Sequence, residues 1–310
     1  MVDLVNPGLL GSATSFKKEY EIPITRSRQP EALKKVVEDG NMRAEELSQL
    51  TSMFILRRTN DVLASYLPPK TDLVVFCHPT KLQREAYLRL LESSALRRAM
   101  EFGDMSTHLS LITTLRKLCN SPGLIMSATG DGAATDATLR EEFGPLLDTC
   151  LKGKSSSGKL LVLDRLLCLL REKTKEKVVV VSNYTQTLDL LETLLKTRNM
   201  SFVRMDGSTP NAKRQAIVDQ FNRTDSAASF VFLLSSKSGG VGLNLIGASR
   251  MILYDVDWNP ANDSQAMARI HRDGQKREVF IYRFLTIGCM DEKIFQRQLT
   301  KQGYLIYISR

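Results

Sequence analysis

The stretch QAMARIHRDGQK, residues 265–276, carries side chains that are well suited to binding an anion. Gln265, Arg269 and Arg272 follow one another at spacings of four and three, which on a helix places all three on one face. A guanidinium group keeps its positive charge and binds phosphate through paired hydrogen bonds. The spacing therefore predicts a helix, capped by Asn262 or Asp263, that presents a glutamine and two arginines to an anionic ligand.

Three further polar segments follow apolar, strand-like runs. SNYTQT begins at Ser182, SSKSGGVGLNL covers 235–245, and YDVDWNPA contains Trp258, the single tryptophan. Glycines let backbone N–H groups approach an anion closely, and an aromatic ring beside cations suits nucleic acid. Each segment also has a plainer interpretation, as a helix cap, a tight turn or a buried tryptophan between surface arginines.

The elements that position these residues alternate from residue 158 onward. Apolar runs of the doubly buried type are followed by amphipathic helical patterns, for example KVVVVS (177–182) and then TQTLDLLETLLKTR (185–198). The helix that starts TPNAKRQ is predicted to have Thr209 as its N-cap. Alternation of this length predicts an α/β fold, a parallel sheet with helices on both faces, with ligands at the carboxyl ends of the strands.

The first half differs in character. Residues 1–126 are predicted to be mostly helical, with one short strand-like run from Leu73 to Cys77. Residues 127–157 are rich in small and polar residues and are predicted to be a linker or insertion. The GKS at 153–155 is not a phosphate loop, because that motif needs a glycine where Asp148 stands.

Composition narrows the class of protein. Residues 1–157 carry 20 Lys+Arg against 19 Asp+Glu, whereas residues 158–310 carry 23 against 15, so the second half holds a net charge of +8. That excess favours a polyanion such as DNA as partner, although a solvated basic surface remains the alternative. Five scattered cysteines and three unclustered histidines predict reduced thiols and no metal site. Neither a secretory leader nor a membrane span is expected.

The motifs together resemble a known family. In this order SNYTQTLD, RMDGST, SSKSGGVGLNL, YDVDWNPA and QAMARIHRDGQ are similar to the C-terminal motor motifs of Swi/Snf-family DNA-dependent ATPases, across residues 158–302. VNPGLLGSATSFKKEYEIPI, ILRRTNDVLASYLPPKTDLVVF and LRKLCNSPGLI resemble the segments that join the two motor lobes. WNPANDSQAMAR and KIFQRQLTKQG resemble the recombination-repair branch, Rad-fifty-four-like and nearest its B-type members. Where relatives usually have CNHP, this chain has Ser121 before Pro122.

The resemblance implies a RecA-like helicase C-terminal lobe, in a nuclear protein, that binds ATP against a first lobe. Arg269 and Arg272 would be arginine fingers on the γ-phosphate, with Gln265 holding them. Gly240, Gly242 and Asn244 would line the nucleotide side. Duplex DNA would contact the following residues: Asn183, Ser235, Ser236, Lys237 and Trp258. A recombinase filament is the further partner that the branch implies.

The sequence lacks two motifs that the family's chemistry needs. GxxxxGK followed by Ser or Thr occurs nowhere, and the only Asp-Glu pair, Asp291-Glu292, lies in a predicted terminal helix. We therefore expect ATP and Mg²⁺ to bind only together with a first lobe that this chain does not contain, and we expect no hydrolysis by this chain alone. The tail, 303–310, departs from relatives, so a fragment of a longer gene or a short regulatory paralogue is expected. A chromatin-remodelling lobe, a non-enzymatic DNA- or partner-binding module and an inactive gene fragment remain alternatives.

Overall fold

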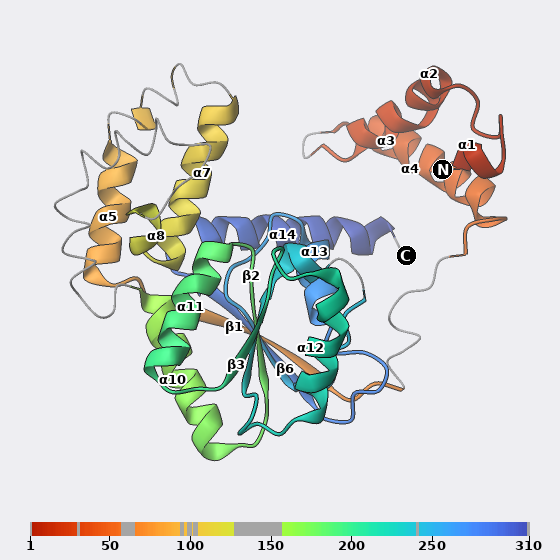
Figure 1. Cartoon of the computed structure of the whole chain (residues 1–310). Helices are drawn as coiled ribbons and strands as arrows, with labels where there is room; N and C mark the ends of the chain where they lie inside the picture. The colour runs from red at the N-terminus through yellow and green to blue at the C-terminus, as the bar shows by residue number, and fades with distance from the viewer. Residues whose placement is uncertain are drawn as a thin grey trace. The chain divides into compact units, whose positions relative to one another are not determined.

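The protein is described by a computed structural model that covers residues 2–29, 32–56, 66–93, 96–97, 101, 105–126, 157–239 and 242–308. It forms two compact units, Met1–Ser65 and Tyr66–Arg310 (Figure 1). The sequence analysis divided the chain within 127–157, whereas the compact units divide it at residues 65 and 66. Nearly all of that predicted linker, 127–156, lies outside the described residues.

The first unit is helical, as the sequence predicts. Its elements are α1 (Val2–Val5), α2 (Ala13–Phe16), the π-helical turn η1 (Lys17–Glu21), α3 (Ile22–Ser27) and α4 (Lys34–Ser52). Gly40 of α4 lies where α3 crosses, and a Cβ atom there would come within 2.2 Å of the Ser27 side chain. The close approach of the two helices therefore requires glycine at this position.

The second unit is built on a six-stranded sheet in the order β1-β6-β5-β2-β4-β3, with every neighbouring pair parallel. The strands are β1 (Lys70–Cys77), β2 (Val178–Ser182), β3 (Phe202–Met205), β4 (Val231–Ser235), β5 (Arg250–Leu253) and β6 (Val279–Thr286). The predicted parallel α/β fold is confirmed. The segment predicted to be mostly helical, however, supplies the edge strand β1, which pairs with β6 from Lys70↔Val279 to Cys77↔Thr286.

Helices cover both faces of this sheet (Figure 1). They are α10 (Gly158–Lys173), α11 (Thr185–Thr197), α12 (Asn211–Arg223), α13 (Pro260–Met267) and α14 (Met290–Ile308), with α5 (Lys81–Glu92), α7 (Met105–Asn120) and α8 (Gly123–Met126) beside them. The predicted atypical tail continues α14 as far as Ile308.

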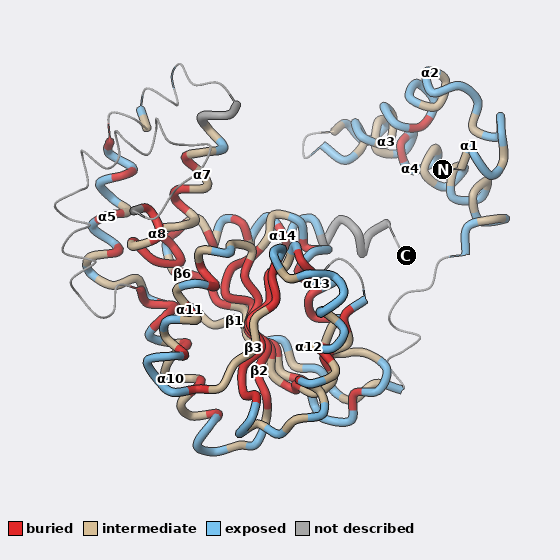
Figure 2. The backbone as a smooth tube through the Cα atoms, viewed as in Figure 1, coloured by how far each residue is buried: buried red, intermediate tan, exposed pale blue. Residues whose placement is uncertain are grey.

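Alternate residues of the central strands serve the two faces. Val178 and Val180 of β2 pack in one apolar cluster with the leucines of α10 and α11, while Val179 and Val181 pack in a second with α12 and α13. All four valines are at most 4% exposed, and Figure 2 shows the central strands as the buried interior. Fully burying such a side chain contributes about 1.5–3 kcal/mol. This double cover fixes the strands and, with them, the loops at their ends.

Two predicted helix starts are wrong in detail. α13 is capped by Asn259, whose Oδ1 accepts the N–H of Ala261 at 3.1 Å, with Pro260 in the first turn. The two predicted cap positions, Asn262 and Asp263, lie inside the helix. α12 begins after Pro210, while the Thr209 hydroxyl instead accepts the N–H of Asp206. Pro260 explains the earlier start of α13, because its fixed φ suits the first position of a helix.

Candidate functional site

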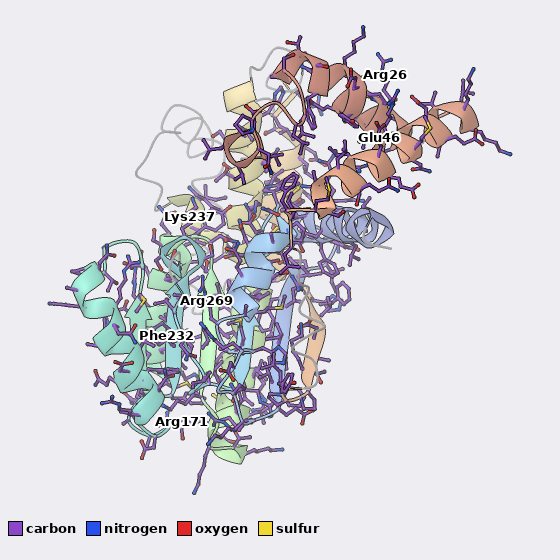
Figure 3. The ribbon with its side chains drawn as sticks, turned by 90° about the vertical axis from the view of Figure 1, so that its right-hand side faces the viewer. Arg26, Glu46, Arg171, Phe232, Lys237 and Arg269 are labelled. Carbon is purple, nitrogen blue, oxygen red and sulfur yellow. The ribbon has the colours of Figure 1, made fainter. Side chains whose placement is uncertain are left out.

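The candidate site lies at the carboxyl ends of β2, β4 and β5, where the polar segments leave the sheet. Figure 3 shows Lys237 and Arg269 toward this end, with Phe232 of β4 further along the strands and Arg171 at the opposite end. Parallel strands carry their carboxyl ends to one edge, so residues as far apart in the sequence as Asn183 and Asp255, 72 positions, come together there. This is the edge that the sequence pattern predicted.

A pocket of about 330 Å³ opens at this edge. It brings together four of the predicted site residues, which are Ser236, Lys237, Gln265 and Arg269. Its other lining residues were not predicted as site residues: Leu234, Asp257, Asn262 and Ala266. With two cations against one carboxylate, the pocket is a net positive cavity suited to an anion.

The two arginines reach this region without the helix that their spacing suggested. α13 ends at Met267, so Gln265 alone is helical, and Arg269 and Arg272 lie in the turns that follow. Arg269 is half-buried, and burial lowers the pKa of its guanidinium, with the positive charge of Arg272 lowering the pKa further. Both effects disfavour the charged guanidinium, and a bound anion would oppose them.

Arg272 faces the glycine-containing loop instead of the pocket. Its Nη1 donates to the carbonyl oxygens of Gly242 and Leu243, at 3.2 Å each. The same loop is tied back by the N–H of Leu245, which donates to the carbonyl of Arg269 at 2.9 Å. Arg272 thus holds the loop, and Gly242 adopts φ +47°, a conformation that favours glycine. Gly240 lies outside the described residues.

Asn244 lies in this loop, and its side-chain oxygen is unusual because it is buried without a hydrogen bond from any described residue. Its Oδ1 is buried and has no hydrogen-bond partner among the described residues, while its backbone carbonyl accepts from Asn222 Nδ2 at 2.7 Å. Buried side-chain acceptors are nearly always paired in proteins. A donor supplied by a ligand is one physical reason for leaving such an oxygen open, which fits the predicted binding role.

A second pocket of about 350 Å³ adjoins the first through Lys237. It is lined by Asn183 and Ser235 from the predicted DNA-contacting set, and by Tyr184, Thr185, Gln186 and Gly207. Ser236 Oγ donates to Asn183 Oδ1 at 2.5 Å, which joins the loops after β2 and β4. Trp258 lines neither pocket and packs instead against Val256, Leu285 and Ile294.

Asp255 orients this second pocket, and the sequence analysis did not give it a role. Its Oδ1 accepts the backbone N–H of Asn183 at 2.8 Å, and its Oδ2 accepts from Ser182 Oγ at 2.5 Å and from Asn120 Nδ2 at 3.1 Å. Asp255 is 4% exposed. Its position directly after β5 could have indicated a role at the strand ends. Its partner Asn120, however, lies 135 residues away, and no local sequence pattern predicts that contact.

A buried ion pair is connected to Asp255 through Asn120, which hydrogen-bonds to both Asp255 and Lys159. Lys159 Nζ lies 2.5 Å from Asp291 Oδ2 and donates to Asn120 Oδ1 at 3.1 Å and to the Tyr254 carbonyl at 2.9 Å. Burial by itself lowers the pKa of Lys159, but the carboxylate of Asp291 outweighs it, so the net pKa is raised and the ammonium stays charged. The network joins α7, α10, β5 and α14 to the candidate site.

Comparison with known proteins agrees with this architecture. The SNF2-related domain model matches residues 1–124, and the helicase conserved C-terminal domain model matches residues 158–274. The DNA repair and recombination protein RAD54B of Homo sapiens is 48% identical and covers 98% of this chain. RDH54 of Saccharomyces cerevisiae, also named a DNA repair and recombination protein, is 51% identical over 98% of the chain. This chain belongs to the SNF2 family.

The SNF2-family chain spans about a third of these relatives, 35% of RAD54B and 32% of RDH54. The C-terminal part of the Fun30 ATPase domain has a similar structure, with a TM-score of 0.57 and 29% identity over 75% of this chain and 90% of that one. The Sulfolobus solfataricus SWI2/SNF2 ATPase core, solved with dsDNA, has a TM-score of 0.60 and 24% identity over 96% of this chain and 56% of that one. The relatives and the domain models confirm the predicted family, and the solved structures confirm the predicted fold.

The described residues show neither a membrane-spanning helix nor a metal-binding cluster. None of their helices has both the length and the hydropathy needed to cross a bilayer. No group of three or more His, Cys, Asp or Glu among them is placed to hold a metal ion.

Proposed function

We propose that this SNF2-family chain is the C-terminal motor lobe of an ATP-dependent double-stranded DNA translocase that acts in nuclear homologous recombination and DNA repair. The observation that carries the proposal is the pair of adjoining pockets that share Lys237. One holds Gln265 and Arg269, and the other holds Asn183. One cation thus lies between an anion pocket and a second polar pocket, an arrangement suited to coupling of ATP to DNA.

The nucleotide fits the first pocket by charge. Arg269 lines it with a lowered pKa, and a triphosphate supplies the compensating negative charge. Arg269 would contact the γ-phosphate, where bound ATP supplies the phosphoryl group, and Gln265 would orient Arg269. Arg272 would act through the loop at 242–243 that it holds and serve as the second finger on release of those carbonyls. Mg²⁺ and the phosphate loop would come from a first lobe.

Duplex DNA would lie over the second pocket. Its backbone phosphates would contact Lys237, Ser235, Ser236 and the amide of Asn183, while Asp255 keeps the loop after β2 in place. Such contacts give little sequence preference and a steep dependence on salt. The repair and recombination names of the relatives, and the net charge of +8 on residues 158–310, support DNA as the partner, and a recombinase filament as the object remodelled.

DNA-stimulated ATP hydrolysis by the complete protein, with its first lobe, tests the proposal. Arg269→Ala should lower the turnover number by about 10³–10⁵, the range for removal of an arginine finger. Arg171→Ala is the matched control, because Arg171 is exposed at the opposite end of the sheet, and it should leave turnover unchanged. Full activity in Arg269→Ala would favour the alternative, a DNA-binding module without catalytic function.

A further inference from the structure

A third pocket lies at the other end of the sheet, at the amino ends of β2, β5 and β6. It has a volume of about 410 Å³ and is lined by Lys175 and Lys177 before β2, Arg277 before β6, and Thr224 after α12. None of the expected roles uses this end. We call these residues, with Asp225 on the rim, the far-edge pocket.

The cations of the far-edge pocket are held by neutral groups. Lys177 is 4% exposed, its Nζ donates to the carbonyl of Phe221 and to Thr224 Oγ1, and it lies 4.6 Å from the Phe221 ring centroid. Arg277 Nη2 donates to the carbonyl of Gly247. In the ion pairs of the described residues, Lys175, Lys177 and Arg277 do not occur.

Positive charge is therefore in excess at this end of the sheet. Three cations face the single carboxylate of Asp225. Burial lowers the pKa of the Lys177 ammonium, and the charge of Arg277 lowers the pKa further, against a smaller opposite effect of Asp225. A buried cation is stabilised when a counter-charge binds, so the far-edge pocket has the electrostatics of an anion site.

The charge continues beyond the pocket on each of its three loops. Lys173 precedes Lys175 by two residues, Arg223 ends α12 next to Thr224, and Lys276 precedes Arg277. All three flanking cations are exposed. The same loops carry Glu176, which pairs with Arg250, and the exposed Glu278, so the cations remain in excess. A single phosphorylated side chain would use the pocket alone. A row of cations on neighbouring loops suits a ligand that repeats its negative charge, and the phosphodiester backbone of a duplex does so.

We propose that the far-edge pocket binds a backbone phosphate of a second duplex segment, at the end of the sheet opposite the candidate DNA site. Lys175, Lys177 and Arg277 contact the phosphate in the pocket, and Lys173, Arg223 and Lys276 contact its neighbours. The two pockets lie at opposite ends of the sheet, about 17 Å of strand apart along the five residues of β2. A short rigid duplex seated across one end would have to bend sharply round the sheet to occupy the other. The lobe then holds two duplexes at once.

Titration of the 310-residue chain with a duplex of about one helical turn, by calorimetry at low salt, tests this inference. Two duplexes should bind per chain. The variant Lys175→Glu with Arg277→Glu should bind one, and the salt slope summed over the bound duplexes should fall in magnitude by about 3–4, at about 0.9 for each phosphate that the pocket and its flanking cations contact. Arg165→Glu, an exposed charge reversal on α10, is the matched control and should keep both sites.

The carboxyl-end variant Lys237→Glu separates this inference from the proposed function. If Lys237→Glu loses one duplex and the far-edge variant loses none, the inference is wrong while the proposed DNA site stands. If the far-edge variant alone loses a duplex, the inference stands and the proposed DNA site is wrong. Preferential binding of a phosphoserine peptide by the far-edge pocket, with duplex stoichiometry unchanged in the variant, would also overturn the inference. Equal thermal melting of the variants and the parent chain checks folding, and Lys175→Gln with Arg277→Gln repeats the test without charge reversal.

Discussion

Replacing Lys159 by methionine should lower the free energy of unfolding of the 66–310 unit by about 3–5 kcal/mol. The Lys159 side chain is 0% exposed and that of Asp291 is 2% exposed, so methionine fills the volume but leaves the carboxylate buried without its counter-ion. Asp291 Oδ2 would keep only the N–H of Thr286, at 3.2 Å, and Asn120 and Tyr254 would each lose a donor.

The expected loss of stability is large because the Lys159–Asp291 pair is buried, and not because the two residues form an ion pair. The pair Lys196–Glu192 has a similar separation, 2.7 Å, but its side chains are 64% and 24% exposed. Exposed pairs contribute about 0.2–1 kcal/mol, because water and salt screen them. Lys196→Met is therefore the matched control, with the same substitution and nearly the same geometry in water. Because single domains are stable by only about 5–15 kcal/mol, the two variants are easily told apart.

Urea denaturation followed by circular dichroism measures both variants, and the midpoint at constant slope gives the difference. A second variant, Lys159→Met with Asp291→Leu, removes the stranded carboxylate and should recover most of the loss. The reasoning would be refuted if Lys159→Met cost no more than Lys196→Met. Failure of the double variant to recover stability would show that the hydrogen bonds to Asn120 and Tyr254, and not the stranded charge, carry the effect.

Three further changes probe single contacts. Asn259→Ala removes the cap of α13 and should cost about 0.5–2 kcal/mol in thermal denaturation, whereas Asn262→Ala, inside the same helix, should cost less. Gly158→Ala places a Cβ atom 1.8 Å from the His78 carbonyl oxygen and should cost about 1–3 kcal/mol; a melting temperature equal to that of the parent would contradict this. Hydrogen bonds from Ser208 lower the pKa of Asp206 against the effect of burial. The ionised Asp206 carboxylate therefore adds to the free energy of unfolding above pH 3.8, its ordinary pKa. That stabilisation is lost as the pH falls through the lower pKa of the folded state. Asp206→Asn should flatten the loss of stability below pH 4 in urea titrations, and an unchanged pH profile would count against it.

Local patterns in the sequence were enough to predict the sheet and most of its helices. KVVVVS predicted a strand buried on both faces, and β2 is buried at all five positions. A run of apolar residues can pack against helices on both faces of the sheet. The order of post-strand motifs also located the candidate edge correctly, since parallel strands direct their carboxyl ends the same way. The run from Leu73 to Cys77 was recognised as strand-like, but its place beside β6 depends on pairing across some 200 residues.

Only the tertiary structure decided how the candidate site is arranged. The spacing of Gln265, Arg269 and Arg272 fits a helix, yet α13 ends at Met267. The next carbonyls are bonded from outside the helix, that of Arg269 by the N–H of Leu245 and that of Ile270 by Gln275 Nε2. Arg269 is thereby aimed into the pocket and Arg272 onto the glycine loop. The sequence predicted which residues gather at this edge. Long-range packing, whose energy no local pattern contains, determined which of them line the pocket.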